Sequence, residues 1–182
     1  VRLLRSLIFN GGFFGGAFVL LFAFSPALVM GRPALRWCGR TWAKLLRGWL
    51  FYTLGVTVEV RGRVPAGPCV VAAKHQSAWE TIAVCGLFSN FCLVVKQGLM
   101  RIPMFGLHLS RMGFIGIDRS AGASALKTLV RGAREVHADG RDIVMFPEGT
   151  RTPPGERKPY QPGIAAVYRD LGVQVVPVAL NS

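Results

Sequence analysis

Acidic residues are scarce in this chain of 182 residues. Its 22 Lys and Arg outnumber 9 Asp and Glu, and the formal net charge is +13. An excess of this size favours an anionic partner: nucleic acid, an anionic membrane surface or a phosphorylated substrate. From Val1 to Val58 there are seven basic residues and no acidic one. The imbalance is therefore complete in the N-terminal third.

The chain also lacks cysteine patterns that bind zinc or form a disulfide framework. Its four cysteines show neither a CxxC spacing nor a zinc pattern with nearby histidines: Cys38, Cys69, Cys85 and Cys92. This absence predicts a reducing compartment. Of the three histidines, His108 and His137 fall within expected helices and have no matching ligands nearby. We therefore expect no metal site and no cofactor.

The longest uncharged stretch lies near the N-terminus. Between Arg5 and Arg32 there are 26 uncharged residues, rich in Leu, Phe, Val, Ala and Gly. A helix of that length extends about 39 Å, more than the ~30 Å hydrocarbon core of a bilayer requires. Ser25-Pro26 predicts a break or turn. The stretch is too long for a signal peptide, and either spanning the membrane or lying in one leaflet fits its sequence.

A basic amphipathic helix is expected from Pro33 to about Leu50. One side carries Arg36, Arg40, Lys44 and Arg47, and the other carries Leu35, Cys38, Trp42, Leu45, Leu46 and Trp49. Cations suit anionic headgroups and indoles suit the headgroup boundary, so this pattern favours an interfacial membrane helix. The alternative is a solvated basic stripe on a helix packed against the domain. Residues 1–50 are thus predicted to associate with a membrane.

From residue 51 onward the chain alternates apolar strands with helices. The expected strands are Val56–Val60, Cys69–Ala73, Phe91–Val95, Gly113–Ile117, Ile143–Phe146 and Gln174–Leu180. The expected helices are about Ala78–Leu87, Pro103–Arg111, Ala123–Ala138 and Pro162–Leu171. This alternation predicts an α/β domain over residues 51–182, with a largely parallel central sheet flanked by helices. Thr152–Pro159 is expected to be an exposed, mobile loop.

Polar clusters follow four of the expected strands. They are Lys74-His75, Lys96, Asp118-Arg119 and the segment from Pro147 to Arg151. In open parallel sheets, ligands bind outside the carboxyl ends of the strands. We therefore expect all four clusters at one edge of the sheet, where they would form an active site.

The residue types in these clusters suit acid–base chemistry on a phosphorylated substrate. His75 precedes a helix and Glu80 lies in its first turn, so the pair can act as a general base with its orienting carboxylate. Three cations can bind phosphate: Lys96, Arg119 and Arg151. Gly149 and Thr150 lie in a tight turn that offers backbone N–H donors.

Structural roles are the alternative for each of these residues taken singly. A histidine at the end of a strand is more often structural than catalytic. Arg119 can pair with Asp118, and Glu148 can pair with Arg151 across a turn.

The order of the clusters resembles the bacterial 1-acyl-sn-glycerol-3-phosphate acyltransferase family, with its glycerolipid acyltransferase fold. Its four motifs are similar to His75–Glu80, Gly113–Arg119, Phe146–Arg151 and Val176–Leu180, and Lys96 with Ile102–Gly106 resembles the segment between motifs. Glu80 stands where the family usually has Asp. The chain stops directly after the fourth motif, from which we expect a C-terminal truncation.

The resemblance implies transfer of an acyl group from a thioester of acyl carrier protein or coenzyme A to the sn-2 hydroxyl of lysophosphatidate. The product is phosphatidic acid for phospholipid synthesis. The implied roles are base for His75, orienter for Glu80, phosphate binding for Lys96, Arg119 and Arg151, and substrate positioning for Glu148, Gly149 and Thr150.

The resemblance implies a location at the inner (cytoplasmic) membrane, with the active site on the cytoplasmic side. We expect no nucleic-acid partner, because the chain contains no recognised nucleic-acid-binding module. Two alternatives remain at this point. One is an acyltransferase acting on another lyso-lipid, such as lyso-ornithine lipid or a lysophospholipid. The other is a non-catalytic protein that binds anionic lipid.

Overall fold

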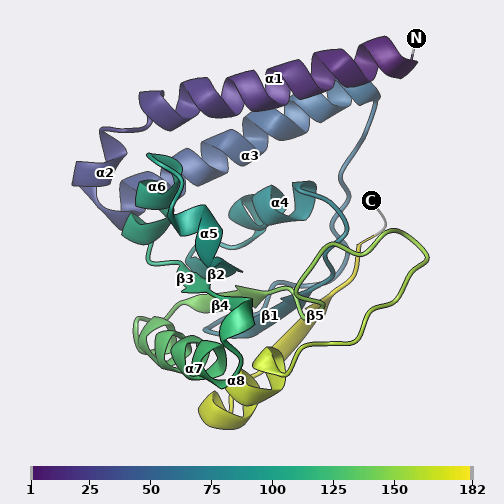
Figure 1. The fold of residues 1–182 in the computed structure, drawn as a ribbon. Helices are drawn as coiled ribbons and strands as arrows, with labels where there is room; N and C mark the ends of the chain where they lie inside the picture. Colours follow the sequence, from purple (N-terminus) through teal and green to yellow (C-terminus); the bar gives the residue numbers. More distant parts are fainter. Residues whose placement is uncertain (1, 181–182) are drawn as a thin grey trace.

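A five-stranded parallel sheet lies at the centre of the computed structural model, which describes residues 2–180 (Figure 1). The strands are β1 Val70–Ala73, β2 Phe91–Lys96, β3 Ile115–Ile117, β4 Asp142–Met145 and β5 Val175–Val178. Their order across the sheet is β3-β2-β4-β1-β5, and every neighbouring pair is parallel. The predicted parallel sheet is confirmed, and the carboxyl ends of all five strands share one edge.

The helices follow the predicted alternation closely. After the N-terminal α1 Arg2–Ala23, α2 Ala27–Met30 and α3 Arg32–Leu54 come α4 Trp79–Leu87, α5 Gln97–Met100, α6 Phe105–Arg111, the 3-10 turn η1 Arg119–Ala121, α7 Ala123–Ala138 and α8 Gly163–Leu171. The short α5 was not predicted. It begins directly after β2 and has the length of a single turn, which is too short to give a periodic apolar pattern.

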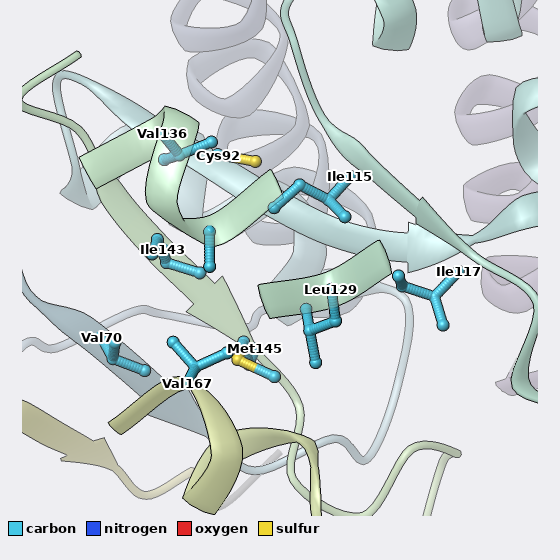
Figure 2. Packing of buried hydrophobic residues seen from close by; sticks show 10 residues of the cluster. Val70, Cys92, Ile115, Ile117, Leu129, Val136, Ile143, Met145 and Val167 are labelled. Carbon is cyan, nitrogen blue, oxygen red and sulfur yellow. The ribbon is translucent and has the colours of Figure 1, made fainter. Parts of the chain in front are cut away.

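Each face of the sheet has its own hydrophobic core. On one face, strand residues pack against Leu129, Ala133 and Val136 of α7 and Val167 of α8 (Figure 2). On the other face they pack against α4 and α6, through residues such as Val84 and Leu109. Successive side chains on a strand point to opposite faces, so Val70 and Val71 enter different cores. Burial on both faces explains the nearly continuous apolar runs.

The expected strand Val56–Val60 is absent from the described residues. This stretch runs from the end of α3 to β1 without pairing, and Val56, Val58 and Val60 are 43%, 36% and 57% exposed. Alternating valines favour a strand only where a neighbouring strand and a buried face exist. The prediction was wrong because the chain uses this stretch as a connection. The helix before it also extends to Leu54, beyond the expected domain boundary at residue 50.

The N-terminal helices form an antiparallel hairpin, in which α1 lies along α3 at the top of Figure 1. Residues 24–26 form the turn predicted around Ser25-Pro26, and α2 follows it. Trp42 and Trp49 pack over the glycines of α1, and Trp49 Nε1 donates to Phe9 O at 3.1 Å. These indoles were expected at a headgroup boundary, which stays a prediction. In the structure they contact α1, where Gly16 and Gly12 leave room for large rings.

The hairpin joins the α/β domain through α3 and α4. Gly39 of α3 faces Cys85, and Gly86 of α4 faces Ala43, which lets the two helices approach closely. The molecule therefore has five layers: α7 with α8, the sheet, α4 with α6, α3, and α1. The basic stripe on α3 is partly used for this attachment, since Arg36 donates to Asn90 at 2.9 Å.

Candidate active site

The side chains of His75 and Glu80 contact each other at the connection between β1 and α4. His75 lies in the turn after β1, and Glu80 lies in the first turn of α4. The His75 Nδ1 atom is 2.7 Å from Glu80 Oε1. An ionised carboxylate only accepts hydrogen bonds, so Nδ1 carries the hydrogen and Nε2 is left to accept a proton. The sequence prediction that this pair approaches each other is confirmed.

Glu80 is fixed by more than the histidine. Its side chain is 2% exposed, and it accepts hydrogen bonds from the backbone of Gln76 and Ser77 at 2.6 and 2.7 Å and from Ser77 Oγ at 2.6 Å. Burial alone raises the pKa of this carboxyl, but the hydrogen bonds from His75 and Ser77 outweigh it and lower the pKa to about 2. Glu80 is therefore ionised over the whole physiological range. The longer side chain reaches both the imidazole and the turn.

The imidazole ring of His75 stacks on the aromatic ring of Phe146. The two ring centroids are 4.2 Å apart and the planes are inclined by 19°. Phe146 follows β4, the strand next to β1, so the stack joins two neighbouring strand ends. Together with the Glu80 bond, it restricts rotation of the ring and aims Nε2. Sequence reasoning missed this contact, because the two residues are far apart in the chain.

Glu148 braces the backbone on the other side of His75. It is 5% exposed, its Oε1 accepts from Lys74 Nζ at 2.6 Å, and its Oε2 accepts from the His75 backbone N–H at 3.0 Å. Burial raises the pKa of Glu148, but the bonds from Lys74 and His75 lower it below its usual range. Glu148 bonds Lys74 and the His75 backbone, not Arg151, with which a pairing was considered. Lys74 takes that place, and the sequence analysis gave it no role.

Arg119 reaches the turn that contains Gly149. A Cβ placed on Gly149 would lie 3.9 Å from Arg119 Nη1, and Gly149 has φ +68°, a conformation that favours glycine. The alternative pairing with Asp118 is not formed, since Asp118 accepts from the backbone and hydroxyl of Ser120. The sheet thus brings Arg119, which follows β3, to the segment that follows β4.

The other predicted cations lie at the same edge and are exposed. Lys96 ends β2 and is in register with Ile117 of β3, which places it beside the start of η1. Arg151 and Thr150 follow the Gly149 turn and are also exposed. The Arg151 carbonyl accepts from Lys158 at 3.2 Å. All four polar clusters therefore follow strands whose carboxyl ends meet at one edge, as predicted.

Neither a metal cluster nor an activated thiol accompanies these residues in the described part of the chain. No group of three or more His, Cys, Asp or Glu side chains among residues 2–180 could hold a metal ion. The four cysteines in this part are free thiols. Burial raises the pKa of the Cys85 thiol to about 11, so it is a poor nucleophile at neutral pH. The site offers an imidazole base, an ionised partner and nearby cations.

Comparison with known proteins gives the family of this chain. The Acyltransferase family model matches residues 55–181, and the chain belongs to this family. It is 34% identical to the 1-acyl-sn-glycerol-3-phosphate acyltransferase of Pseudomonas aeruginosa, covering 100% of this chain and 72% of that protein. It is 31% identical to the Helicobacter pylori enzyme of the same name, covering 71% of this chain and 56% of that protein.

A solved structure shares the fold. The crystal structure of the 1-acyl-sn-glycerophosphate acyltransferase PlsC from Thermotoga maritima aligns with a TM-score of 0.66, covering 97% of this chain and 80% of that one. The two sequences are 23% identical over this alignment. The likeness extends over the N-terminal hairpin as well as the α/β domain, since nearly the whole chain is covered.

Proposed function

We propose that this acyltransferase moves a fatty acyl group from a thioester to the sn-2 hydroxyl of 1-acylglycerol-3-phosphate, giving phosphatidic acid. The observation that carries the proposal is the 2.7 Å contact between His75 Nδ1 and the buried Glu80 at the edge that also holds Arg119. The names of the curated relatives from Pseudomonas and Helicobacter support the choice of substrate.

In the proposed mechanism, His75 Nε2 takes the proton of the sn-2 hydroxyl while its oxygen attacks the thioester carbonyl. Collapse of the tetrahedral intermediate breaks the carbon–sulfur bond, and the departing thiolate takes the proton from the imidazolium. Glu80 stabilises the imidazolium and fixes the Nδ1–H tautomer. Its low pKa keeps it charged throughout.

The remaining edge residues bind and position the acceptor. Arg119 and Arg151 can grip a phosphate bidentately, and Lys96 adds a third positive charge. The turn at Gly149 and Thr150 positions the glycerol backbone. Glu148 acts through its hold on Lys74 and the His75 backbone. The thioester comes from acyl carrier protein or coenzyme A.

Replacing His75 tests the base directly. His75→Ala should lower kcat by roughly 10²–10⁴-fold, the usual contribution of general-base catalysis, without unfolding the protein. His137→Ala on α7 is the matched control and should keep full activity. Acyl transfer by His75→Ala at more than a tenth of the wild-type rate would remove His75 from the mechanism.

The acceptor is tested separately with a panel of lyso-lipids. Lysophosphatidate should be the best acceptor, because the cations at the edge require a phosphate. Lyso-ornithine lipid lacks a phosphate, so its preference over lysophosphatidate would contradict the roles of Arg119 and Arg151.

The same proposal places the hairpin on the cytoplasmic face of the inner membrane. Leu3–Ala23 in α1 is long and apolar enough to cross a bilayer, judged by length and composition, and its large apolar side chains are mostly exposed. However, α1 lies along α3, which carries Arg40, Lys44 and Arg47 and packs on α4. Crossing the bilayer would draw these charges into hydrocarbon at high cost. We infer that α1 lies in one leaflet.

Vesicle flotation tests this attachment. The double variant Phe14→Asp/Phe18→Asp puts charges on the exposed side of α1 and should abolish co-flotation with anionic vesicles. Tyr168→Asp changes an exposed aromatic on α8 and should float like the wild type. Equal flotation of all three proteins would contradict membrane binding through α1.

A further inference from the structure

A cationic hollow lies next to the His75 turn. It has a volume of about 690 Å³, and its lining includes Lys74, Glu148, Arg157, Lys158 and Tyr160. With Glu156 counted, three cations line it against two carboxylates. Lys74 and Glu148 neutralise each other, which leaves Arg157 and Lys158 against Glu156, so the hollow has a net positive charge. This composition suits an anionic group.

Lys74 connects the hollow to the site chemistry. Its ammonium group has three donors, and one of them is used by Glu148 at 2.6 Å. Its side chain is 30% exposed, so the other donors can reach a ligand. Lys74 directly precedes His75, and Glu148 bonds both the Lys74 ammonium and the His75 backbone N–H, so the hollow begins at the segment that carries the imidazole.

The loop that forms the outer wall is attached to the site at both ends. The Thr152 backbone N–H donates to His75 O at 2.8 Å, and the Gln161 backbone N–H donates to Pro147 O at 2.8 Å. Lys158 Nζ adds a bond to the Arg151 carbonyl at 3.2 Å. Between these ends the loop contains three prolines, which restrict its backbone: Pro153, Pro154 and Pro159. The loop was predicted to be exposed and mobile: its residues 153–161 are exposed, as predicted, and its ends are hydrogen-bonded to the segments that hold His75 and Pro147.

The strand order separates this hollow from Arg119. β4 stands between β2 and β1 in the sheet. Arg119 and Lys96 follow β3 and β2 on one side of the Gly149 turn, whereas Lys74 follows β1 on the other side. Two groups of cations therefore lie on opposite sides of the Gly149 turn. An acyl transfer between a phosphorylated acceptor and a thioester carrier has two anionic substrates to place.

We propose that the hollow at Lys74, Arg157 and Lys158 binds the phosphate of the phosphopantetheine arm that carries the acyl thioester. Coenzyme A and acyl carrier protein share this phosphate, so one site serves either donor. The loop lies at the right of Figure 1, well apart from α1 at the top, so a donor from the aqueous side can approach it. This inference rests on the proposed function, because it needs a thioester donor.

The first test compares donors in the double variant Arg157→Ala/Lys158→Ala. Losing charged hydrogen bonds to a phosphate should raise the KM of hexadecanoyl-CoA and of hexadecanoyl-acyl carrier protein by roughly tenfold or more. The KM of lysophosphatidate should not change, and kcat should change less than the donor KM. The charge-matched control is Lys127→Ala/Arg131→Ala on α7, where both side chains are exposed.

The outcomes of this comparison are separable. A rise in KM for only one donor would overturn the shared phosphate, since the contact would then be to the rest of that carrier. A rise for lysophosphatidate alone would assign the hollow to the acceptor and also overturn the proposal.

The second test isolates the phosphate itself. Phosphopantetheine should inhibit the wild-type enzyme competitively with the donor and about tenfold more strongly than pantetheine, which lacks the phosphate. In Arg157→Ala/Lys158→Ala the two inhibitors should be equal. Equal inhibition of the wild type would overturn the site. If instead the wild type transfers no acyl group from either donor, the proposed function fails, and this is seen before any inhibitor is added.

Discussion

The carboxylates and the cations at the edge of the sheet are held in opposite ways. Glu80 and Glu148 are buried and accept hydrogen bonds from residues on both sides of His75. Lys96, Arg119 and Arg151 are exposed at the same edge. Burying a charge is favourable only when its partners are in place, whereas an exposed cation stays hydrated until a ligand arrives. The proposed base is therefore arranged in advance, and the proposed phosphate site is open to solvent.

The largest effect on activity should come from removing the charge of the buried carboxylate Glu80. Glu80→Gln keeps the shape but removes the charge that stabilises the imidazolium, so kcat should fall by roughly 10²–10⁴-fold. Glu80→Asp restores a carboxylate and should recover most of the loss. Steady-state kinetics check both. If Glu80→Gln were as active as Glu80→Asp, the charge of Glu80 would have no role.

The same carboxylate should make stability depend on pH. Its folded pKa of about 2 lies below the usual 4.5, so its contribution is complete above pH 4.5 and is lost as the pH falls toward 2. Since a pKa difference of one unit corresponds to about 1.36 kcal/mol, the full difference is about 3 kcal/mol. The stability gap between wild type and Glu80→Gln should narrow as the pH is lowered from 6 to 3. Urea unfolding measures this gap, and a constant gap would contradict the low pKa.

Replacing Glu148 should lower the free energy of unfolding by less than replacing Glu80 does. Glu148→Gln removes the charge that pairs with Lys74, and because Lys74 is partly hydrated the cost should be about 1–2 kcal/mol. Glu156→Gln is the control on the neighbouring loop, where the side chain is exposed, and should stay within about 0.5 kcal/mol of wild type. Thermal unfolding in detergent compares the three proteins. Equal losses for both variants would show that burial of Glu148 does not matter.

The exposed side should affect binding more than stability. Arg119→Ala should raise the KM of lysophosphatidate by roughly tenfold while leaving the unfolding temperature unchanged, because Arg119 is an exposed residue. Arg131→Ala on α7 controls for the lost charge. A fall in stability without a change in KM would show that Arg119 stabilises the fold and does not bind the substrate.

Much of the fold was readable from local patterns. Apolar runs of strand length predicted all five strands of the sheet, and the period of α7 predicted its bounds, Ala123–Ala138. The closeness of His75 and Glu80 was also predictable, since they are five residues apart across a turn and the start of a helix. The family motifs strengthened the choice of these residues.

Long-range partners could not be predicted in the same way. Lys74 and Glu148 are 74 residues apart, and they meet only because β4 is placed beside β1. The stack of Phe146 on His75 has the same origin. Val56–Val60 failed as a strand because no neighbour pairs with it in the described residues, although its own pattern favours one.

The sequence by itself determined the apolar helix, the basic helix, the strand–helix alternation and the polar residues that follow the strands, since each depends on neighbours within a few positions. Only the tertiary structure decided which of these residues touch. Strand order set Lys74 on Glu148 and Arg119 at Gly149, and helix packing turned Trp42 and Trp49 toward α1. Such contacts depend on how distant segments are placed in space, which no local pattern specifies.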